Sequence, residues 1–377
     1  MRRFLILCIS SCLTTLSLAQ TFDSFPLARP LYHLPDTATI LIMGDVMMHR
    51  DQITNARRSD GTYDFSTYLV NLKEMIESAD VAVANMEFTL AGKPYTGYPC
   101  FSAPDGYEDY VADCGVDVFL TANNHILDKG KIGIERTLKR YSFMEGTRGI
   151  KHTGSSVSAS DDAGRFPLYI VSKGVRIALI NFTYGTNTSI DSKFPKVHRT
   201  DTSEIGKAIR KAKADGVDFI IALPHWGTEY VLKHSPSQEK LARWLASQGC
   251  DAIIGAHPHV VQDVGKVVVP DSDGIGSKSV PVVYSMGNVI SNMSAVNTRI
   301  GLIVTLKIVT DLFGNKNLLE PELTLTWCTR PGTLTGSYST IPVKDFIGKG
   351  GSWISKGDYD NMISSYNRVR SVTGIND

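Results

Sequence analysis

The chain has 377 residues, of which 42% are hydrophobic and 20% are charged. This length and composition suit one principal folded domain with a large core. The 39 lysines and arginines are balanced by 38 acidic residues. The sequence therefore lacks the strong positive field that recruits nucleic acid, and we expect no nucleic-acid partner.

The N-terminal residues have the pattern of a secretory signal peptide. Two arginines precede an apolar run from Phe4, and small residues follow at Ser17 and Ala19. We predict a signal peptide over residues 1–19, cleaved after Ala19, and hence an exported protein in the periplasm or at the cell surface. The alternative is a retained membrane anchor, although the apolar run is shorter than the ~20 residues that span a bilayer.

Beyond this segment the cysteines are Cys100, Cys114, Cys250 and Cys328. They show no C-x-x-C spacing, which argues against a thiolate zinc site or a redox pair. Export permits disulfides. The sequence leaves two alternatives. Either Cys100 and Cys114 form a disulfide that closes a short loop, or all four thiols are unpaired.

Apolar runs typical of buried strands recur along the chain, at residues 39–43, 81–85, 117–123, 176–182, 218–225, 251–257 and 281–288. Amphipathic stretches between several of these runs predict helices over 133–145, 203–216 and 237–249. This alternation predicts an α/β fold in which helices cover a sheet.

The pattern changes after Asn297. Two longer runs, 299–309 and 318–330, alternate more clearly, so we expect them to pair antiparallel and to complete a second sheet against the first. A helix is expected near 359–370, and residues 271–279 have the composition of a polar surface loop. We therefore predict a main domain over 36–330 and a C-terminal extension over 331–377.

Polar residues follow the predicted strands at the points where they end. In an α/β sheet, ligands bind beyond the carboxyl ends of the strands. The residues found there include Asp45, Asn85, Glu87, Asn123, Asn124, His125, His225, Glu229, His257, His259 and Asn288. Each has an ordinary structural explanation on its own, such as a turn or a helix cap for Asp45. Their shared position at strand ends favours a polar or metal site.

Carboxylate and amide oxygens combined with neutral imidazoles suit Mn, Zn or Fe. His257 and His259 flank Pro258, which restricts the local backbone. A carboxylate that bridges two ions about 3.5–4 Å apart would let them act on both the attacking and the leaving oxygens of a substrate. We expect one or two divalent ions, with Glu87 as the candidate bridge.

Six blocks of residues occur in the order of one known family. They are GDVMMHR, ANMEF, LTANNHILDKG, LPHWGTEY, GAHPHVVQ and YSMGN, between about Ala38 and Asn292. The chain resembles the CapA or PgsA proteins of poly-γ-glutamate capsule synthesis, whose fold is similar to that of calcineurin-like metallophosphoesterases. The resemblance implies a sandwich of two mixed β-sheets flanked by helices.

The resemblance also implies roles for particular residues. It implies a metal site made of Asp45, Glu87, Asn124, His225, His257 and His259. His125 is similar to a histidine that protonates the leaving group or stabilises charge, and Asp128 would orient it. The side of the site that faces the substrate would include Asn85, Trp226, Glu229 and Tyr230.

One departure from the metallophosphoesterase pattern affects the expected chemistry. Those enzymes usually begin with Asp-x-His, and Met47 here stands in place of that histidine. A thioether is a poor replacement for imidazole at a hard or borderline ion. His49 lies two residues further on and is a candidate replacement, while one metal position is expected to be weaker or absent.

The stretch from Lys93 to Tyr110 is rich in aromatic residues, glycine and proline, and is expected to lie over the site either as a substrate rim or as a packed loop. Four basic residues are candidates to contact an anionic substrate: Lys93, Arg50, Arg57 and Arg58. The alternative is that they are ordinary cations on the protein surface. We expect metal-assisted hydrolysis or transfer on poly-γ-glutamate or a related anionic peptide polymer, with a membrane synthase as a further partner. The alternatives are a periplasmic phosphoesterase and a non-catalytic polymer-binding scaffold.

Overall fold

The structure is a computed structural model that describes residues 35–270 and 276–377. The predicted signal peptide lies outside the described residues. Within them, no helix combines the length and apolar character needed to cross a bilayer.

The first of two large sheets has a parallel half and an antiparallel half. Its strands are β1 (Asp36–Val46), β2 (Val81–Met86), β3 (Val118–Leu120), β4 (Lys151–Thr153), β13 (Asn288–Ile290), β14 (Ile300–Thr310), β15 (Lys316–Leu318), β16 (Glu322–Thr329) and β17 (Ser339–Pro342). They lie in the order β17-β16-β14-β1-β2-β3-β4, with β13 beside β1 and β15 beside β14. β1 pairs in parallel with β2 and antiparallel with β14.

The second large sheet is also mixed. It contains β6 (Leu168–Ser172), β7 (Val175–Thr183), β9 (Phe219–His225), β10 (Ala252–Ile254), β11 (Val264–Pro270) and β12 (Ser277–Val283). β7, β9, β10 and β12 run parallel, while β6 and β11 are antiparallel strands at its edges. A small ribbon joins β5 (Ser155–Ser156) and β8 (Lys196–Val197).

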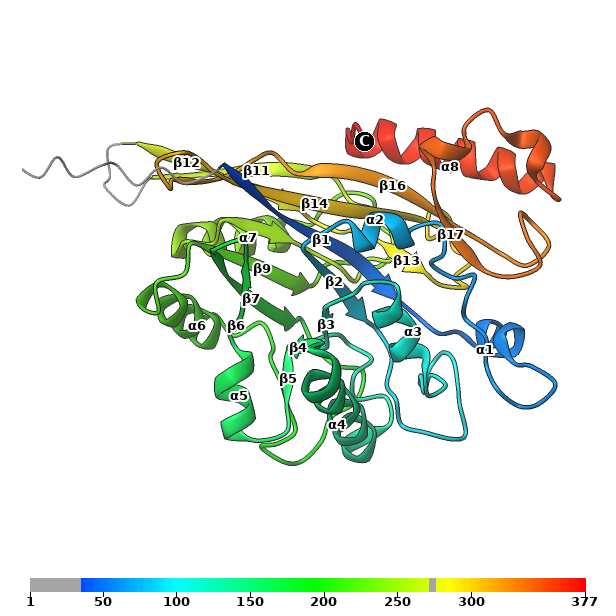
Figure 1. Ribbon diagram of the computed structural model, residues 1–377, viewed down its shortest axis with the longest axis horizontal. Coiled ribbons are helices and arrows are strands. Elements are labelled where there is room, and N and C mark those ends of the chain that lie inside the picture. The colour runs from blue at the N-terminus through cyan, green and yellow to red at the C-terminus, as the bar shows by residue number, and fades with distance from the viewer. Residues whose placement is uncertain (1–34, 271–275) are drawn as a thin grey trace, which may run out of the picture.

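Helices flank the two sheets (Figure 1). They are α1 (Arg50–Ala56), α2 (Lys73–Glu77), α3 (Tyr107–Asp113), α4 (Gly130–Arg148), α5 (Ala159–Arg165), α6 (Thr202–Ala214), α7 (Pro236–Gln248) and α8 (Lys356–Thr373), with short 3₁₀ turns at Lys344–Phe346 and Gly350–Ser352. The predicted helices over 133–145, 203–216 and 237–249 correspond to α4, α6 and α7. The predicted sandwich of two mixed sheets flanked by helices is confirmed.

Alternating side chains of β1 separate two cores. Ile40 and Ile42 pack into the core between the sheets, where they join Leu179 and Ile221 of the second sheet. Their neighbours in the strand face the other way, into the core beneath the helices on the first sheet. Because successive residues of a strand point to opposite faces, a strand that is buried on both faces must be apolar throughout. This explains the unbroken apolar run at 40–43.

The strands after Asn297 correct one prediction. β14 and β16 do pair antiparallel, with Leu302 opposite Leu325. The prediction that they complete a second sheet is wrong, because β14 pairs with β1 along eight positions and so extends the first sheet. Both faces of β14 are apolar. Ile303 lies in the core beneath the helices on the first sheet, hereafter the helix-side core, and Leu302 lies in the core between the sheets. A strand of this kind suits a central position.

The predicted strand at 281–288 is divided between the two sheets. Its first residues end β12 in the second sheet, and its last residue begins β13 in the first. Gly287 lies between them at a φ of 62°, a left-handed conformation that glycine adopts without steric cost. The predicted polar loop at 271–279 falls partly outside the described residues, and β12 already begins at Ser277.

The segment after residue 330 packs onto the same core. β17 pairs with β16, and α8 (red in Figure 1) places Met362, Tyr366 and Val369 in the core between the sheets. Arg299 at the start of the β14 region forms an ion pair with Asp358 on α8. The division into a main domain at 36–330 and an extension at 331–377 stays a prediction.

The four cysteines in the described part of the chain are all free thiols. The expected alternative of unpaired cysteines therefore describes this structure, and the Cys100–Cys114 bridge is not formed. Burial of Cys250 and Cys328 raises the pKa of both thiols, which makes them poor nucleophiles.

Replacing the buried Met362 by alanine tests whether α8 is part of the cooperative unit. Met362 is fully buried, so Met362→Ala should lower the free energy of unfolding by about 2–5 kcal/mol. Urea denaturation followed by circular dichroism measures this change. The exposed Asn367→Ala on the same helix is the control and should change it by less than about 0.5 kcal/mol. A separate early transition in Met362→Ala would instead show that α8 unfolds independently.

Candidate functional site

The first ligand position is set by a close approach of two backbone segments. Asp45 lies at the end of β1, and its amide donates to the carbonyl of Gly287 at 3.0 Å. A Cβ atom on the preceding residue, Gly44, would lie 2.0 Å from that carbonyl oxygen. Glycine is therefore required at position 44 for the end of β1 to approach this turn.

The loop that follows β10 carries His257 and His259 in left-handed backbone conformations. Their φ angles are 102° and 57°, which are uncommon for residues other than glycine. The loop is held by two backbone hydrogen bonds, from Trp226 N to Ala256 O at 3.0 Å and from Tyr230 N to Pro258 O at 2.8 Å. Strain of this kind is typical of functional sites, where surrounding contacts hold the backbone in place.

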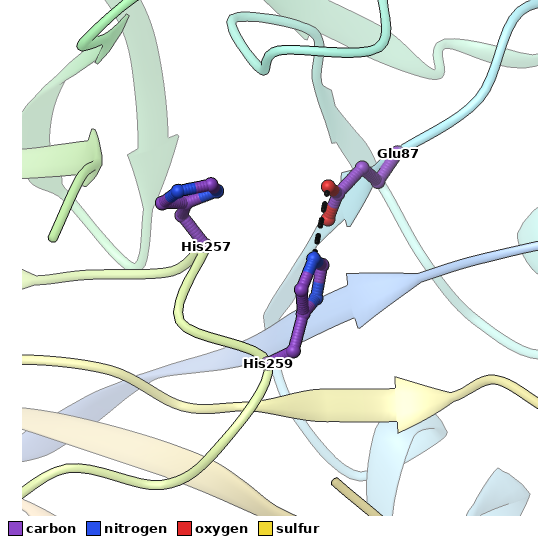
Figure 2. A group of neighbouring side chains, drawn as sticks. All are labelled: Glu87, His257 and His259. Atoms are coloured by element: carbon purple, nitrogen blue, oxygen red, sulfur yellow. Dashed lines mark ion pairs between the residues drawn. The ribbon is translucent and has the colours of Figure 1, made fainter. Parts of the chain in front are cut away.

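Glu87, His257 and His259 form the first of two candidate ligand groups. One ligand atom from each lies within 4.8 Å of the others. Figure 2 shows Glu87 extending from beyond β2 toward both imidazoles, with Oε1 of Glu87 3.7 Å from Nε2 of His259. All three side chains are buried.

Asp45, Glu87 and His225 form the second group, also within 4.8 Å. Oε1 of Glu87 lies 3.7 Å from Nε2 of His225. The same nitrogen lies 2.8 Å from Oδ1 of Asn124, so the amide oxygen and the imidazole approach one point. Oδ2 of Asp45 lies 3.2 Å from Nδ1 of His259, and this contact joins the second group to the first. Glu87 is common to both groups.

Burial and neighbouring charges shift the pKa values of the candidate ligands in different directions. Burial and then the charge of His257 lower the pKa of His225 well below 6.5, and burial and then His259 lower that of His257 to about 3. Burial opposes ionisation of Asp45, but His259 outweighs it and lowers the pKa of Asp45 to about 2. Two imidazoles are thus neutral at neutral pH, the form that binds a metal.

His259 and Glu87 have pKa values shifted in the upward direction. Burial lowers the pKa of His259, but its interaction with Asp45 raises it on balance. Burial and then the nearby Asp45 carboxylate raise the pKa of Glu87 well above 4.5. A carboxyl group next to another carboxylate and out of water is stable in its ionised form only beside a cation.

The donor set fits a divalent metal centre. Both oxygens of Glu87 are buried without a hydrogen-bond partner, as are Oδ2 of Asp45 and Nδ1 of His257. Buried polar atoms normally have partners, and a cation between the two groups would satisfy those of Glu87. Mixed carboxylate, amide and imidazole ligands suit Mn, Zn or Fe, while the identity and number of the ions stay predictions.

His125 and Asp128 form a pair next to this centre. Nδ1 of His125 lies 2.7 Å from Oδ2 of Asp128, which also accepts a hydrogen bond from the backbone amide of Phe101 at 2.8 Å. The carboxylate therefore holds Nδ1 and leaves Nε2 of His125 as the nitrogen that can transfer a proton. This geometry agrees with the orienting role expected of Asp128.

The residues expected on the substrate side have different positions. Asn85 is 1% exposed and lies beneath the ligands, where its amide donates to Oδ1 of Asp45 at 2.7 Å and lies 3.3 Å from Nδ1 of His225. It positions ligands and does not face solvent. Glu229 and Tyr230 are exposed, and the Tyr230 ring lies 6.3 Å from that of His259.

Trp226 lines a cavity of about 500 Å³ beside the centre. Tyr184 lines the same cavity, and its ring centroid lies 4.5 Å from that of His257. The indole N–H of Trp226 donates to the carbonyl of Tyr284 at 2.9 Å, which fixes this wall. Tyr184 therefore lies between His257 and the cavity, which extends to Leu241 and Trp244 on α7.

Met47 and His49 do not join the candidate ligand groups. Met47 is 1% exposed and packs in the helix-side core. Nδ1 of His49 accepts a hydrogen bond from the amide of Asn292 at 3.2 Å, and burial lowers the pKa of His49 to about 4. Among the described residues, His49 belongs to none of the groups of histidine, cysteine and acidic side chains with metal-ligand spacing.

The segment from Lys93 to Tyr110 reaches the centre through Phe101. The Phe101 ring packs against His125 at 4.7 Å and against His49 at 5.3 Å. The phenyl ring thus shields the His125–Asp128 pair from water. Arg58 forms an ion pair with Asp64, and contact of Lys93, Arg50, Arg57 or Arg58 with a substrate stays a prediction.

Three further residues lie near the centre; Asn288 was identified from the sequence as a strand-end residue without an assigned role, and Asn187 and Tyr184 were not identified. Asn288 accepts from Nδ1 of His259 at 3.0 Å, Nδ2 of Asn187 lies 3.3 Å from Nδ1 of His125, and Tyr184 packs against His257. Tyr184 follows the end of β7, so the position after a strand could have indicated it. Asn187 lies in an irregular connection, and the sequence carries no signal for it.

A third group with metal-ligand spacing lies elsewhere, at Asp162, His198 and Glu204. Lys196 forms ion pairs with both carboxylates, and His198 lies 2.7 Å from Asp162. The lysine ammonium already supplies the cation that these carboxylates need. This group is an ion-pair network that joins α5, β8 and α6.

Comparisons with known proteins agree with the resemblance in the motifs. A family model described as "Bacterial capsule synthesis protein PGA_cap" matches residues 39–293. "Capsule biosynthesis protein CapA" of Bacillus anthracis is 28% identical over 277 residues, which cover 69% of this chain and 61% of that protein. "PGA biosynthesis protein CapA" of Bacillus subtilis (strain 168) is 24% identical, with 70% and 66% covered. The chain thus spans less than two thirds of either relative.

Among solved structures, the calcineurin-like phosphoesterase YfkN from Bacillus subtilis is similar over 78% of this chain and 91% of that one. The sequence identity is 16% and the TM-score is 0.42. A similarity at this level carries no weight for function.

Replacing Glu87 by glutamine should have opposite effects with and without metal. The folded-state pKa of Glu87 is raised above 4.5, so its contribution to stability is present below pH 4.5 and is lost as the pH rises. In chelator at pH 8, Glu87→Gln should therefore unfold at a higher urea concentration than the unchanged protein.

Addition of Mn or Zn should make the unchanged protein the more stable of the two. Metal at one hundred times its Kd should raise the free energy of unfolding of the unchanged protein by about 2.7 kcal/mol and should not raise that of the variant. Glu135→Gln on the surface of α4, which removes the same charge, is the control. Equal stabilisation of Glu87→Gln and the unchanged protein by metal would show that Glu87 is not a ligand.

Proposed function

Because the chain belongs to the bacterial capsule synthesis protein PGA_cap family, we propose that it acts on poly-γ-glutamate or a related anionic peptide polymer by metal-assisted hydrolysis or transfer. The family supports a role in capsule biosynthesis. The name of the Bacillus subtilis relative refers to PGA biosynthesis, and this supports the choice of polymer.

One observation supports catalysis above all others. Glu87 is completely buried, both of its oxygens lack a hydrogen-bond partner, and it is shared by two groups that each contain a neutral histidine. A divalent ion held there would polarise a carbonyl or phosphoryl oxygen of the substrate and activate water. Asp45, Glu87, Asn124, His225, His257 and His259 would hold one or two such ions.

The chain's own acid would be His125. Asp128 accepts from its Nδ1, so the imidazolium form of His125 would give the proton on Nε2 to the leaving amine when a peptide-like bond breaks. Phe101 keeps this pair out of water, which strengthens the interaction between imidazole and carboxylate. Tyr184 and Trp226 would contact the part of the substrate that enters the adjacent cavity.

We further propose that the protein is exported through the N-terminal signal pattern and works beside a membrane synthase. The pattern of arginines, apolar residues and a small-residue cleavage site supports this location. N-terminal sequencing of the protein recovered from cells tests it, and a mature chain that begins at Gln20 is the expected result.

Loss of His257 should remove both metal and turnover. We expect His257→Ala to lower the hydrolysis or transfer of γ-glutamyl oligomers by about 10²–10³-fold, since ligand loss removes several kcal/mol of transition-state stabilisation. Mass spectrometry of the products and elemental analysis of the protein measure the two effects. His234→Gln is a matched control, because His234 lies outside the ligand groups and pairs with Asp263.

Loss of His125 should separate proton transfer from metal binding. His125→Ala should keep its metal and lower kcat by about 10²–10⁴-fold, the usual contribution of a general acid. Elemental analysis and steady-state kinetics on the same preparation measure both quantities. Equal loss of metal and activity would make His125 a ligand or a folding determinant instead.

The same measurements distinguish the other candidate functions. Turnover of a phosphodiester in place of γ-glutamyl oligomers, lost in His257→Ala, would identify a phosphoesterase. Oligomer binding without metal and without turnover would identify a polymer-binding scaffold.

A further inference from the structure

Three arginines line a second cavity, of about 280 Å³, away from the candidate metal centre. The cavity lies between the loop that joins β13 to β14 and the helix α8; Figure 1 labels these two strands and the helix. Arg299, Arg330 and Arg368 line it together with Trp327 and polar side chains of Ser294, Asn297, Asn361 and Ser365. This wall contains no carboxylate.

The positive charge of the cavity is only partly neutralised. Arg299 forms a bidentate ion pair with Asp358 and packs on the Trp327 ring at 4.1 Å. Among residues 35–270 and 276–377, no carboxylate forms an ion pair with Arg330 or Arg368. The nearby Asp51 instead accepts from the side chain of Asn292 at 2.8 Å.

The guanidinium groups of Arg330 and Arg368 are held in place by neutral groups. Arg330 donates to the carbonyls of Asn292 and Met293, at 3.3 and 2.7 Å, and its Nε is buried without a partner. Arg368 donates to Oδ1 of Asn297 at 2.8 Å and to Oγ of Ser365 at 3.1 Å. Two fixed cations that face one polar cavity form a binding site for an anion, and the planar fork of arginine suits a carboxylate.

The loop that lines this cavity also contacts the candidate metal centre. Asn288 at one end of the segment contacts His259, and the amide of Asn292 donates to His49. Five residues lie between Asn288 and Ser294, so the Cα atoms of these two residues are at most about 22 Å apart. One extended polymer of a few residues can therefore reach both places.

We propose that the cavity lined by Arg330 and Arg368 binds a carboxylate of an anionic peptide polymer while another part of the same chain lies at the metal centre. This inference rests on the proposed function for the identity of the polymer. The arginines would act as a subsite that holds the polymer and selects for its length, and they would take no part in bond cleavage.

The test measures binding of γ-linked tetraglutamate by calorimetry in a metal-loaded His125→Ala background, which should keep the metal and consume the oligomer only slowly. Arg368→Gln and, separately, Arg330→Gln should weaken binding about tenfold or more, because each removes a charge-assisted contact. Lys356→Gln is the matched control: it lies on the same helix, removes the same charge and is ion-paired with Asp360 outside the cavity. It should change the affinity by less than about twofold.

Arg368 is exposed and Arg330 also holds the loop, so Arg368→Gln is the decisive variant. Unchanged affinity for tetraglutamate in Arg368→Gln, or an equal loss in Lys356→Gln, overturns the subsite. Inorganic phosphate is titrated in parallel. Arg368-dependent binding of phosphate without binding of tetraglutamate also overturns it, because the cavity would then serve a free phosphate.

Failure of the subsite is distinguishable from failure of the proposed function. In one outcome, the unchanged protein turns over γ-glutamyl oligomers, His257→Ala does not, and Arg368→Gln has no effect on oligomer affinity. This outcome contradicts the subsite and supports the proposed function. Arg368-dependent oligomer binding without any turnover keeps the subsite and removes the catalytic proposal.

Discussion

The desolvation of one carboxylate, Glu87, is the constraint on which the site depends. Both oxygens are buried without hydrogen-bond partners, beside the carboxylate of Asp45 and within reach of three histidines. Taking an ionised carboxylate out of water costs several kcal/mol unless a cation or hydrogen bonds replace the lost hydration. A protein gains nothing in stability from such an arrangement, so the position of Glu87 is best explained by what it binds.

The two-sheet sandwich makes this arrangement possible. Asp45 and Glu87 come from the first sheet, and His225 and the His257–His259 loop come from the second. The carboxylates and the imidazoles therefore meet only because the ends of β1 and β2 lie next to those of β9 and β10. Gly44 lets the end of β1 approach the turn between β12 and β13, since a Cβ at Gly44 would overlap the Gly287 carbonyl.

Binding of a polymer requires contacts beyond the reactive bond. The cavity at Tyr184 and Trp226 adjoins the centre, and the arginine-lined cavity lies further along the β13–β14 loop. The overall charge is nearly balanced, so attraction of a polyanion would have to come from local groups such as Arg330 and Arg368. Residues 331–377 contribute Arg368 through α8, so this part of the chain would affect substrate binding as well as stability.

The sequence alone determined the elements and the chemistry at their ends. Apolar runs and amphipathic stretches predicted the principal strands and helices, because side-chain periodicity is a local property. The residues that follow the strands, from Asp45 to His259, were identified for the same reason. The sequence did not determine which strands pair, and β14 joins β1 although its pattern suggested another sheet.

Only the tertiary structure decided which groups meet. Asn85 lies beneath Asp45 and His225, Met47 points into the helix-side core, and Asn187 reaches His125 from an irregular connection. The arginine cavity likewise combines Arg299, Arg330 and Arg368 from three separate segments. Such contacts depend on how sheets and loops pack over long separations in the chain, and the local pattern of residues contains no information about that packing.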